Sequence, residues 1–234
     1  MNKQGEGKIE YLTHTWSPVT GCLHGCSYCY MQRMAKRFPQ ISMVPKYHPE
    51  RIVEPAMTKK PSRIGVSFTG DLFGEWVPVE WISNVLNVCK CIPKHRFLLL
   101  TKNPKRYGEF VIPGNCWTGT SVTGGSIDDC RFENARVEQL IEGTKRGRRF
   151  LSLEPFMAIP NGDAGSLIDL WIANMDWLIV GGLTGKGKGG VDQEDLELIL
   201  DACEEHNVRI FIKNNAQYFA GKIQEYPADL ILGE

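Results

Sequence analysis

The chain of 234 residues carries 27 basic residues (Lys and Arg) and 27 acidic residues, so its formal net charge is zero. This balance excludes a protein that is held to nucleic acid by bulk positive charge, although a local basic groove is compatible with it. The hydrophobic content of 42% is ordinary for a globular protein, and no apolar run reaches the roughly 18 residues that a membrane span needs. Because the N-terminus also lacks the apolar segment of a signal peptide, we expect a cytoplasmic protein with no membrane partner. Its eight cysteines are then expected to be thiols or metal ligands rather than disulfides.

Short apolar segments alternate with amphipathic segments along the chain. The apolar segments are rich in Val, Ile, Leu and Phe and end at Gly, Pro or polar residues, which predicts buried strands. These strands are expected within Ile9–Trp16 and over Arg63–Phe68, Arg96–Thr101, Cys116–Val122, Arg149–Leu153, Asp176–Gly181 and Val208–Lys213. Helices are expected between them, over Tyr30–Phe38, His48–Lys59, Pro78–Cys91, Asp128–Glu142, Ser166–Ala173 and Gln193–His206, with a helical turn over Pro104–Phe110.

The repeated order of strand and helix predicts a parallel sheet with right-handed crossovers. The expected fold class is therefore α/β, as a parallel (β/α) barrel that is partial or near-complete and has about six to seven β/α units. No linker, repeat or low-complexity tract interrupts the pattern, so residues 1–234 are expected to form a single domain.

Polar residues gather where the predicted strands end, which is where parallel barrels carry their chemistry. Thr69-Gly70-Asp71 follows the second strand, and Thr120-Ser121 ends the fourth. Glu154 ends the fifth strand, and alternation along that strand places it on the same face as Ser152. Glu154 is a candidate for binding substrate or ribose hydroxyls; alternatively, it forms a structural ion pair.

Two lysines at strand ends are the candidate partners of Glu154 in such a pair, and they are equally candidate anchors for an anionic substrate. They are Lys102, after the third strand, and Lys213, after the seventh.

Three cysteines follow the first predicted strand in the spacing Cys22-x3-Cys26-x2-Cys29. Three thiolates this close together can hold three corners of a cubic iron–sulfur cluster, which leaves the fourth iron open to a substrate or cofactor. Gly21 and Gly25 allow the loop to fold tightly. The same cysteines, together with His24 or His14, could instead bind a structural zinc ion.

This spacing, with the aromatic Tyr28 directly before the third cysteine, resembles the signature of the radical S-adenosylmethionine (radical SAM) superfamily. The resemblance implies a radical-SAM-type barrel in which Cys22, Cys26 and Cys29 ligate a [4Fe–4S] cluster and S-adenosylmethionine chelates the fourth iron. It further implies that one electron, from a donor such as flavodoxin or ferredoxin, cleaves the cofactor to a 5′-deoxyadenosyl radical. The radical would abstract hydrogen from an unidentified substrate, for which a nucleic-acid base or nucleotide is the first hypothesis.

The resemblance also assigns cofactor-binding roles. Tyr28 stands where the superfamily has an aromatic residue that contacts adenine. Thr69, Gly70 and Asp71 resemble the Gly-Gly-Glu motif that contacts the methionine amino group, although Thr69 replaces its first glycine and Asp71 its glutamate.

Thr120 or Ser121 would contact the ribose or the carboxylate, because the superfamily often places a hydroxyl or amide there. Glu154 is expected to bind the ribose hydroxyls or to act on the substrate, with Lys213 beside it as a second catalytic residue.

Three further segments, Trp16–Cys22, Ser152–Pro155 and Asp176–Gly182, resemble a phage- and prophage-associated radical-SAM-like family of unknown function. Ser17 departs from that family, in which an asparagine is expected. The cysteine loop alone also resembles that of spore photoproduct lyase, a DNA-repair member of the superfamily.

Two other functions remain open at the level of sequence. The first is a non-catalytic iron–sulfur or zinc protein that binds nucleic acid. The second is a nucleotide hydrolase, because residues 182–189 fit seven positions of the phosphate-binding pattern G-x-x-x-x-G-K-[ST]. The eighth position is Gly189, so the hydroxyl that would bind Mg²⁺ is missing, and a glycine-rich lid is the alternative interpretation.

Overall fold

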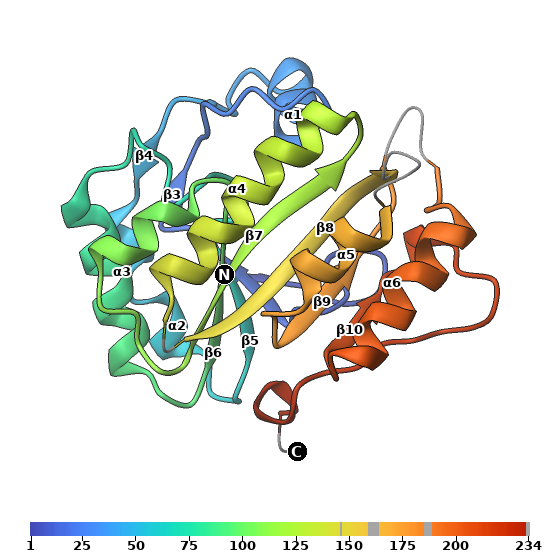
Figure 1. The fold of residues 1–234 in the computed structure, drawn as a ribbon. Helices are drawn as coiled ribbons and strands as arrows, with labels where there is room; N and C mark the ends of the chain where they lie inside the picture. Colours follow the sequence, from blue (N-terminus) through green and yellow to red (C-terminus); the bar gives the residue numbers. More distant parts are fainter. Residues whose placement is uncertain (146, 159–163, 185–188, 233–234) are drawn as a thin grey trace. The chain divides into compact units, whose positions relative to one another are not determined.

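The computed structural model describes residues 1–145, 147–158, 164–184 and 189–232. The chain forms two compact units, coloured from blue to green and from green to red in Figure 1. Unit 1 contains Met1–Thr118 and the last residues of the chain, and unit 2 contains Gly119–Ile231. The prediction that residues 1–234 form a single domain is not tested by this division and stays a prediction.

Unit 1 is built on parallel strands. Its sheet has the strand order β1 (Asn2–Lys3), β2 (His14–Trp16), β5 (Arg63–Val66) and β6 (Arg96–Thr101). β2, β5 and β6 are parallel, whereas β1 pairs antiparallel with β2. A separate antiparallel pair joins β3 (Val19–Thr20) to β4 (Lys46–Tyr47). The aliphatic and aromatic residues of β5 and β6 are largely buried, as expected for strands covered on both faces.

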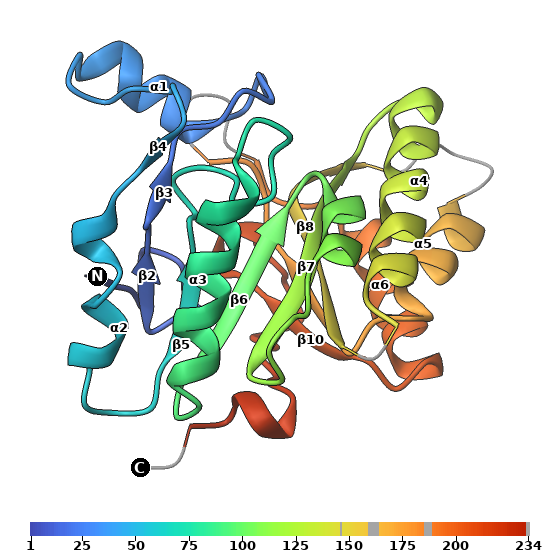
Figure 2. The same cartoon turned by 90° about the vertical axis from the view of Figure 1, so that its left-hand side faces the viewer.

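The helices of unit 1 are α1 (Tyr30–Arg37), η1 (Pro49–Arg51), α2 (Glu54–Met57), α3 (Val79–Cys91) and η2 (Pro104–Glu109). α3 buries Ile82, Val85, Leu86 and Cys89, which recur at helical spacing and form one apolar face. α1 buries none of its residues. Figure 2 shows α2 and α3 beside the strands, and α1 at the top of the view, past the ends toward which the strand arrows point.

Unit 2 repeats the strand–helix order. Its strands, in spatial order, are β7 (Cys116–Gly124, which begins in unit 1), β8 (Arg148–Ala158), β9 (Trp177–Val180) and β10 (Arg209–Ile212). β8, β9 and β10 are parallel. Its helices are α4 (Ile127–Gly143), α5 (Ala164–Ile172) and α6 (Gln193–Glu205), followed by η3 (Asn214–Ala216) and η4 (Ala228–Leu230). Figure 1 shows α4, α5 and α6 on one face of these strands.

The predicted α/β class with parallel strands is confirmed, and several element boundaries differ from the prediction. The helix expected over His48–Lys59 is two short pieces, η1 and α2. Pro55 explains the break, because its ring cannot donate a hydrogen bond and collides with the carbonyl of Arg51, where η1 ends. β8 continues to Ala158, five residues past the expected end. β1, β3 and β4 were not predicted, because segments of two residues show no periodicity.

Among the residues that the structure describes, no helix combines the length and the apolar character that crossing a membrane would require.

Candidate functional site

The cysteine loop (Gly21–Cys29) leaves β3 and leads into α1. Its start is fixed by the backbone N–H of Cys22, which donates to the carbonyl of Met43 at 2.9 Å. Gly21 has a φ of 85°, and a Cβ at this position would lie 2.3 Å from the carbonyl oxygen of Val44. Only glycine fits this turn, which brings the first cysteine close against the segment before β4.

The three thiols of the cysteine loop are half-buried. Burial, together with the negative charges of Asp71, Cys26 and Cys29, raises the pKa of the Cys22 thiol to about 12. Cys29 is the N-cap residue of α1, where the helix dipole favours a negative group. A thiolate at Cys22 therefore needs a nearby cation, and a bound metal centre would supply it.

The three cysteines can be compared with the needs of a cluster and of a single ion. Across the described part of the chain, no three His, Cys, Asp or Glu side chains are placed to hold one metal ion. A cubic cluster does not require such convergence, because each cysteine binds a different iron. His24, the nearer candidate for a fourth zinc ligand, directs its Nε2 to Asp71. A carboxylate partner of this kind is typical of a histidine that binds metal through its other ring nitrogen, so the donor set is compatible with an iron–sulfur cluster and with zinc.

Asp71, a predicted cofactor-binding residue, joins three parts of unit 1. Its side chain is 5% exposed, and Oδ2 lies 2.7 Å from His24 Nε2 in the cysteine loop. Oδ2 also accepts a hydrogen bond from the backbone N–H of Lys102 at 3.0 Å, and Oδ1 accepts one from that of Phe73 at 3.0 Å. The ring of His24 packs edge-on against Trp76, with a centroid distance of 4.8 Å. The carboxylate thus anchors the cysteine loop to the ends of β5 and β6.

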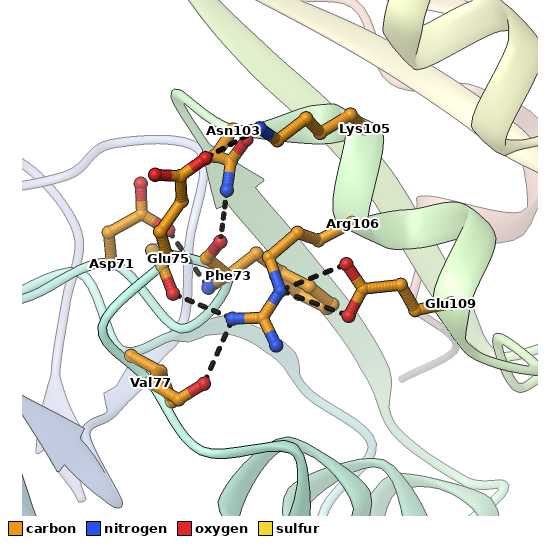
Figure 3. Close-up of polar contacts among 9 residues, drawn as sticks. Asp71, Phe73, Glu75, Val77, Asn103, Lys105, Arg106 and Glu109 are labelled. Carbon is orange, nitrogen blue, oxygen red and sulfur yellow. Dashed lines mark hydrogen bonds and ion pairs between the residues drawn. The ribbon is translucent and has the colours of Figure 1, made fainter.

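The loop after β5, which carries Asp71, is fixed by further polar contacts (Figure 3). The Asn103 amide donates to the carbonyl of Phe73 at 2.9 Å. The Arg106 guanidinium donates to the carbonyls of Gly74 and Val77 at 2.7 and 2.9 Å. Buried polar side chains that are fully hydrogen-bonded rigidify the segment that they hold, so Asp71 has a rigid setting.

Three buried polar atoms near the cysteine loop have no hydrogen-bond partner among the residues described: Ser67 Oγ, Thr69 Oγ1 and Trp76 Nε1. Ser67 is 1% exposed and has a φ of 57°, a left-handed conformation that is uncommon outside glycine. Buried polar atoms are normally paired, so a ligand could supply the missing partners here. Thr69 is a predicted site residue, whereas Ser67 carries no sequence signal because it stands inside an apolar run.

Tyr28 and Gly70, also predicted site residues, lie beside the cysteine loop. Lys102 Nζ is 5.4 Å from the centroid of the Tyr28 ring, and the Tyr28 carbonyl accepts a hydrogen bond from the Arg33 guanidinium at 2.9 Å. Gly70 forms a parallel bridge with Gly21. A Cβ at position 70 would lie 2.6 Å from the Gly21 carbonyl oxygen. The glycine therefore allows the ends of β5 and the cysteine loop to touch.

In unit 2, Glu154 and Lys213 are brought together although they are far apart in the sequence. Lys213 Nζ forms an ion pair with Glu154 Oε1, and the side chains are 12% and 19% exposed. The Ser152 hydroxyl donates to Glu154 Oε2 at 3.3 Å. A Cβ at Gly181 would lie 2.8 Å from Glu154 Oε1, so the glycine leaves room for the carboxylate. Lys213, one of the two predicted partners, thus pairs with Glu154.

Asn215 joins this pair and was not predicted as a site residue. Its amide nitrogen donates to the carbonyl of Gly182 at 2.7 Å, while its Oδ1 is buried without a hydrogen-bond partner among the described residues. That oxygen would lie 3.2 Å from a Cβ at Gly181. The signal in the sequence was the polar run that directly follows the last strand.

The remaining predicted site residues of unit 2, Thr120 and Ser121, lie in β7 and are 0% and 9% exposed. The Ser121 carbonyl accepts a hydrogen bond from Arg136 at 2.6 Å. Their cofactor-binding roles stay predictions. Half of the predicted phosphate-binding pattern over residues 182–189 falls on residues 185–188, which lie outside the described residues.

The fold is similar to solved structures of spore photoproduct lyase. One variant with bound AdoMet and dinucleoside spore photoproduct matches with a TM-score of 0.59 and 12% identity, over 85% of this chain and 75% of that chain. A second variant matches with a TM-score of 0.60 and 10% identity, over 89% and 78% of the two chains. At such identities the likeness establishes the fold, and the radical-SAM-type α/β barrel class expected from the sequence is confirmed.

No curated protein sequence matches this chain. A family model does match, over residues 6–229, which is nearly the whole chain. The chain belongs to the family described as protein of unknown function (DUF5131).

Proposed function

We propose that this protein is a radical SAM enzyme that holds a [4Fe–4S] cluster through Cys22, Cys26 and Cys29. The observation that carries the proposal is the cysteine loop itself, with three half-buried thiols after the first strands of a chain that has the fold of spore photoproduct lyase. When bound, the cluster and S-adenosylmethionine would supply a reductively generated 5′-deoxyadenosyl radical for hydrogen abstraction. The residues of the protein would then bind the cofactor and the substrate, orient them, and exclude water from the site.

The residues of unit 1 fit this cofactor pair. Donation from His24 to the buried Asp71 carboxylate holds the cysteine loop in place. Ser67 Oγ and Thr69 Oγ1 are buried polar atoms that have no hydrogen-bond partner among the described residues. An amino or carboxylate group of S-adenosylmethionine has the donors and acceptors to pair with them. In this proposal the hydroxyls bind cofactor, and Asp71 positions the cysteine loop.

The residues of unit 2 are proposed to bind substrate. Lys213 Nζ can donate to an anionic group such as a phosphate, and Glu154 can accept from a hydroxyl or an exocyclic amine. Asn215 Oδ1 adds a second acceptor beside Gly181. Thr120 and Ser121 remain assigned to cofactor binding by their place in β7.

We further propose a nucleic-acid base or nucleotide as the substrate. The support is the fold likeness to spore photoproduct lyase, structures of which are complexed with dinucleoside spore photoproduct. We also propose a cytoplasmic location, an electron donor such as flavodoxin or ferredoxin, and an association with phages. The phage association is supported by the resemblance of Trp16–Cys22, Ser152–Pro155 and Asp176–Gly182 to a phage-associated family.

The experiment is anaerobic reconstitution with iron and sulfide, followed by dithionite and S-adenosylmethionine. We expect about four irons per chain, and formation of 5′-deoxyadenosine. Cys26→Ala should abolish both, whereas Cys91→Ala, which removes an exposed cysteine outside the cysteine loop, should leave both unchanged. Stoichiometric zinc with no 5′-deoxyadenosine would instead identify a zinc-binding protein.

A further inference from the structure

The charges of this neutral chain are strongly segregated near the cysteine loop. Residues 11–49 contain no Asp and no Glu, although the whole chain has 27 acidic residues. The same stretch carries Arg33, Lys36, Arg37 and Lys46. Along this stretch the basic side chains have no acidic neighbour in the sequence, a local asymmetry that the zero net charge conceals.

These basic side chains reach solvent. α1 begins directly after Cys29, and none of its residues is buried. Lys36, Arg37 and Lys46 are exposed. In the described part of the chain, none of these three forms an ion pair with a carboxylate. A helix without buried residues contributes little to the core, so its amphipathic sequence is available to a partner.

Exposed apolar side chains accompany the basic ones. Leu23, Tyr30 and Val44 are 56%, 50% and 68% exposed. Leu23 and Tyr30 flank the first and third cysteines in sequence, and the hydrogen bond from Cys22 to Met43 brings the Val44 segment to the same loop. Leu23, Tyr30, Lys36, Arg37, Val44 and Lys46 are called the α1 surface below.

The composition of the α1 surface favours a protein partner over a nucleic acid. Contacts to a phosphate backbone use basic and polar side chains, whereas protein interfaces combine an apolar, partly aromatic centre with a charged rim. Exposed leucine, tyrosine and valine beside three cations match the second description. Charge complementarity then requires an acidic partner.

We propose that the α1 surface is the docking site of an acidic one-electron donor protein. The inference rests on the proposed function, because a cluster in the cysteine loop needs one electron for each cleavage. In the docked pair the donor is oxidised by one electron and the cluster is reduced by one electron. Leu23, Gly25 and Ser27 are exposed and alternate with half-buried residues of the cysteine loop, so the outer side of the loop faces the bound donor.

The test compares two reductants on the reconstituted protein. The charge-reversal variant is Lys36→Glu/Arg37→Glu/Lys46→Glu, in which Arg33 is kept because it donates to the Tyr28 carbonyl. The matched control, Lys59→Glu/Lys60→Glu/Lys90→Glu, changes the net charge equally at exposed positions away from the α1 surface. Cluster reduction is followed by stopped-flow absorbance with purified reduced flavodoxin, purified reduced ferredoxin, or dithionite.

We expect the charge-reversal variant to lower the second-order rate of reduction by the protein donors at least about tenfold at low ionic strength, and less at high salt. Its reduction by dithionite and its iron content should equal those of the wild type, and the control should behave as the wild type with every reductant. The neutral variant Lys36→Gln/Arg37→Gln/Lys46→Gln should show an intermediate effect.

Three outcomes would overturn the docking site. The first is equal reduction rates in the charge-reversal variant and the control, and the second is no reduction of the wild-type cluster by either donor protein. The third is loss of oligonucleotide binding in the charge-reversal variant while its reduction by both donors is unchanged. The last would assign the α1 surface to nucleic acid. Failure of the proposed function itself is separate, because it appears as absent 5′-deoxyadenosine in the wild type with dithionite.

Discussion

Asp71 in unit 1 and Glu154 in unit 2 were both predicted at strand ends, and the structure gives them different surroundings. Asp71 lies in the loop after β5 and Glu154 lies inside β8, and each was predicted to bind a ligand. The Asp71 carboxylate is buried and accepts from two backbone N–H groups and from His24. The Glu154 carboxylate is more exposed and meets the side chains of Lys213 and Ser152. Backbone donors immobilise a carboxylate, whereas side-chain partners can exchange for a ligand, so the two acids are suited to different tasks.

The same contrast predicts where substitutions act. Changes in unit 1 around Asp71 should alter the cysteine loop and its iron content. Changes around Glu154 should leave iron binding intact and alter the local ion pair and, under the proposed function, substrate binding.

The largest effect is expected for Gly21→Ala. A Cβ there would lie 2.3 Å from the Val44 carbonyl oxygen, at a φ of 85° that only glycine adopts readily. The start of the cysteine loop has to move, so we expect loss of more than half of the reconstituted iron. Gly25→Ala is the control, because it has a φ of 70° but nothing within 4 Å of its Cβ, and it should cost only about 1–2 kcal/mol of unfolding free energy. Equal iron contents in the two variants would contradict this account of the loop.

Asp71→Asn tests the anchoring role. The substitution keeps the shape but removes the charge and one acceptor oxygen from three hydrogen bonds, so we expect a loss of about 3 kcal/mol in urea unfolding and a reduced iron content. Glu154→Gln is the matched change in unit 2 and should leave iron unchanged. If Asp71→Asn kept full stability and iron but lost S-adenosylmethionine binding, Asp71 would be a cofactor ligand, as the sequence motif suggests.

A smaller effect is expected at the Glu154–Lys213 pair. A double-mutant cycle with Glu154→Gln and Lys213→Met should give a coupling free energy of about 1–2 kcal/mol, between the values for exposed and buried pairs. Lys213→Arg should retain much of it, because the positive charge remains. Chemical unfolding of the four proteins measures the coupling, and a value near zero would show that the two side chains do not stabilise each other.

The sequence predicted the fold well where apolar runs were uniform and less well where single residues interrupt them. β6 agrees residue by residue with the predicted Arg96–Thr101. β5 ends at Val66 rather than Phe68, because Ser67 adopts a left-handed conformation that its apolar neighbours do not reveal. β8 continues through Pro155 to Ala158, although Phe156 is the one buried residue after Leu153 in this strand.

The candidate site was predictable where local spacing or strand ends encode it, as for the three cysteines, Glu154 and Lys213. It was not predictable where it depends on contacts between distant segments. His24 and Asp71 are separated by 47 positions, and the sequence around either residue contains no pattern that predicts their pairing. The unpartnered oxygens of Ser67 and Asn215 likewise depend on what surrounds them in three dimensions.

Leu23, Gly25 and Ser27 lie at the solvent boundary between the cysteines. Under the proposed function, a route that is short enough for an incoming electron is equally short for dissolved dioxygen. The cluster would then be intrinsically vulnerable to oxidative damage, since these residues of the loop are exposed. We expect iron to be lost within a few air-exposed purification steps, and activity to depend on cells that keep dioxygen scarce or rebuild the centre continuously.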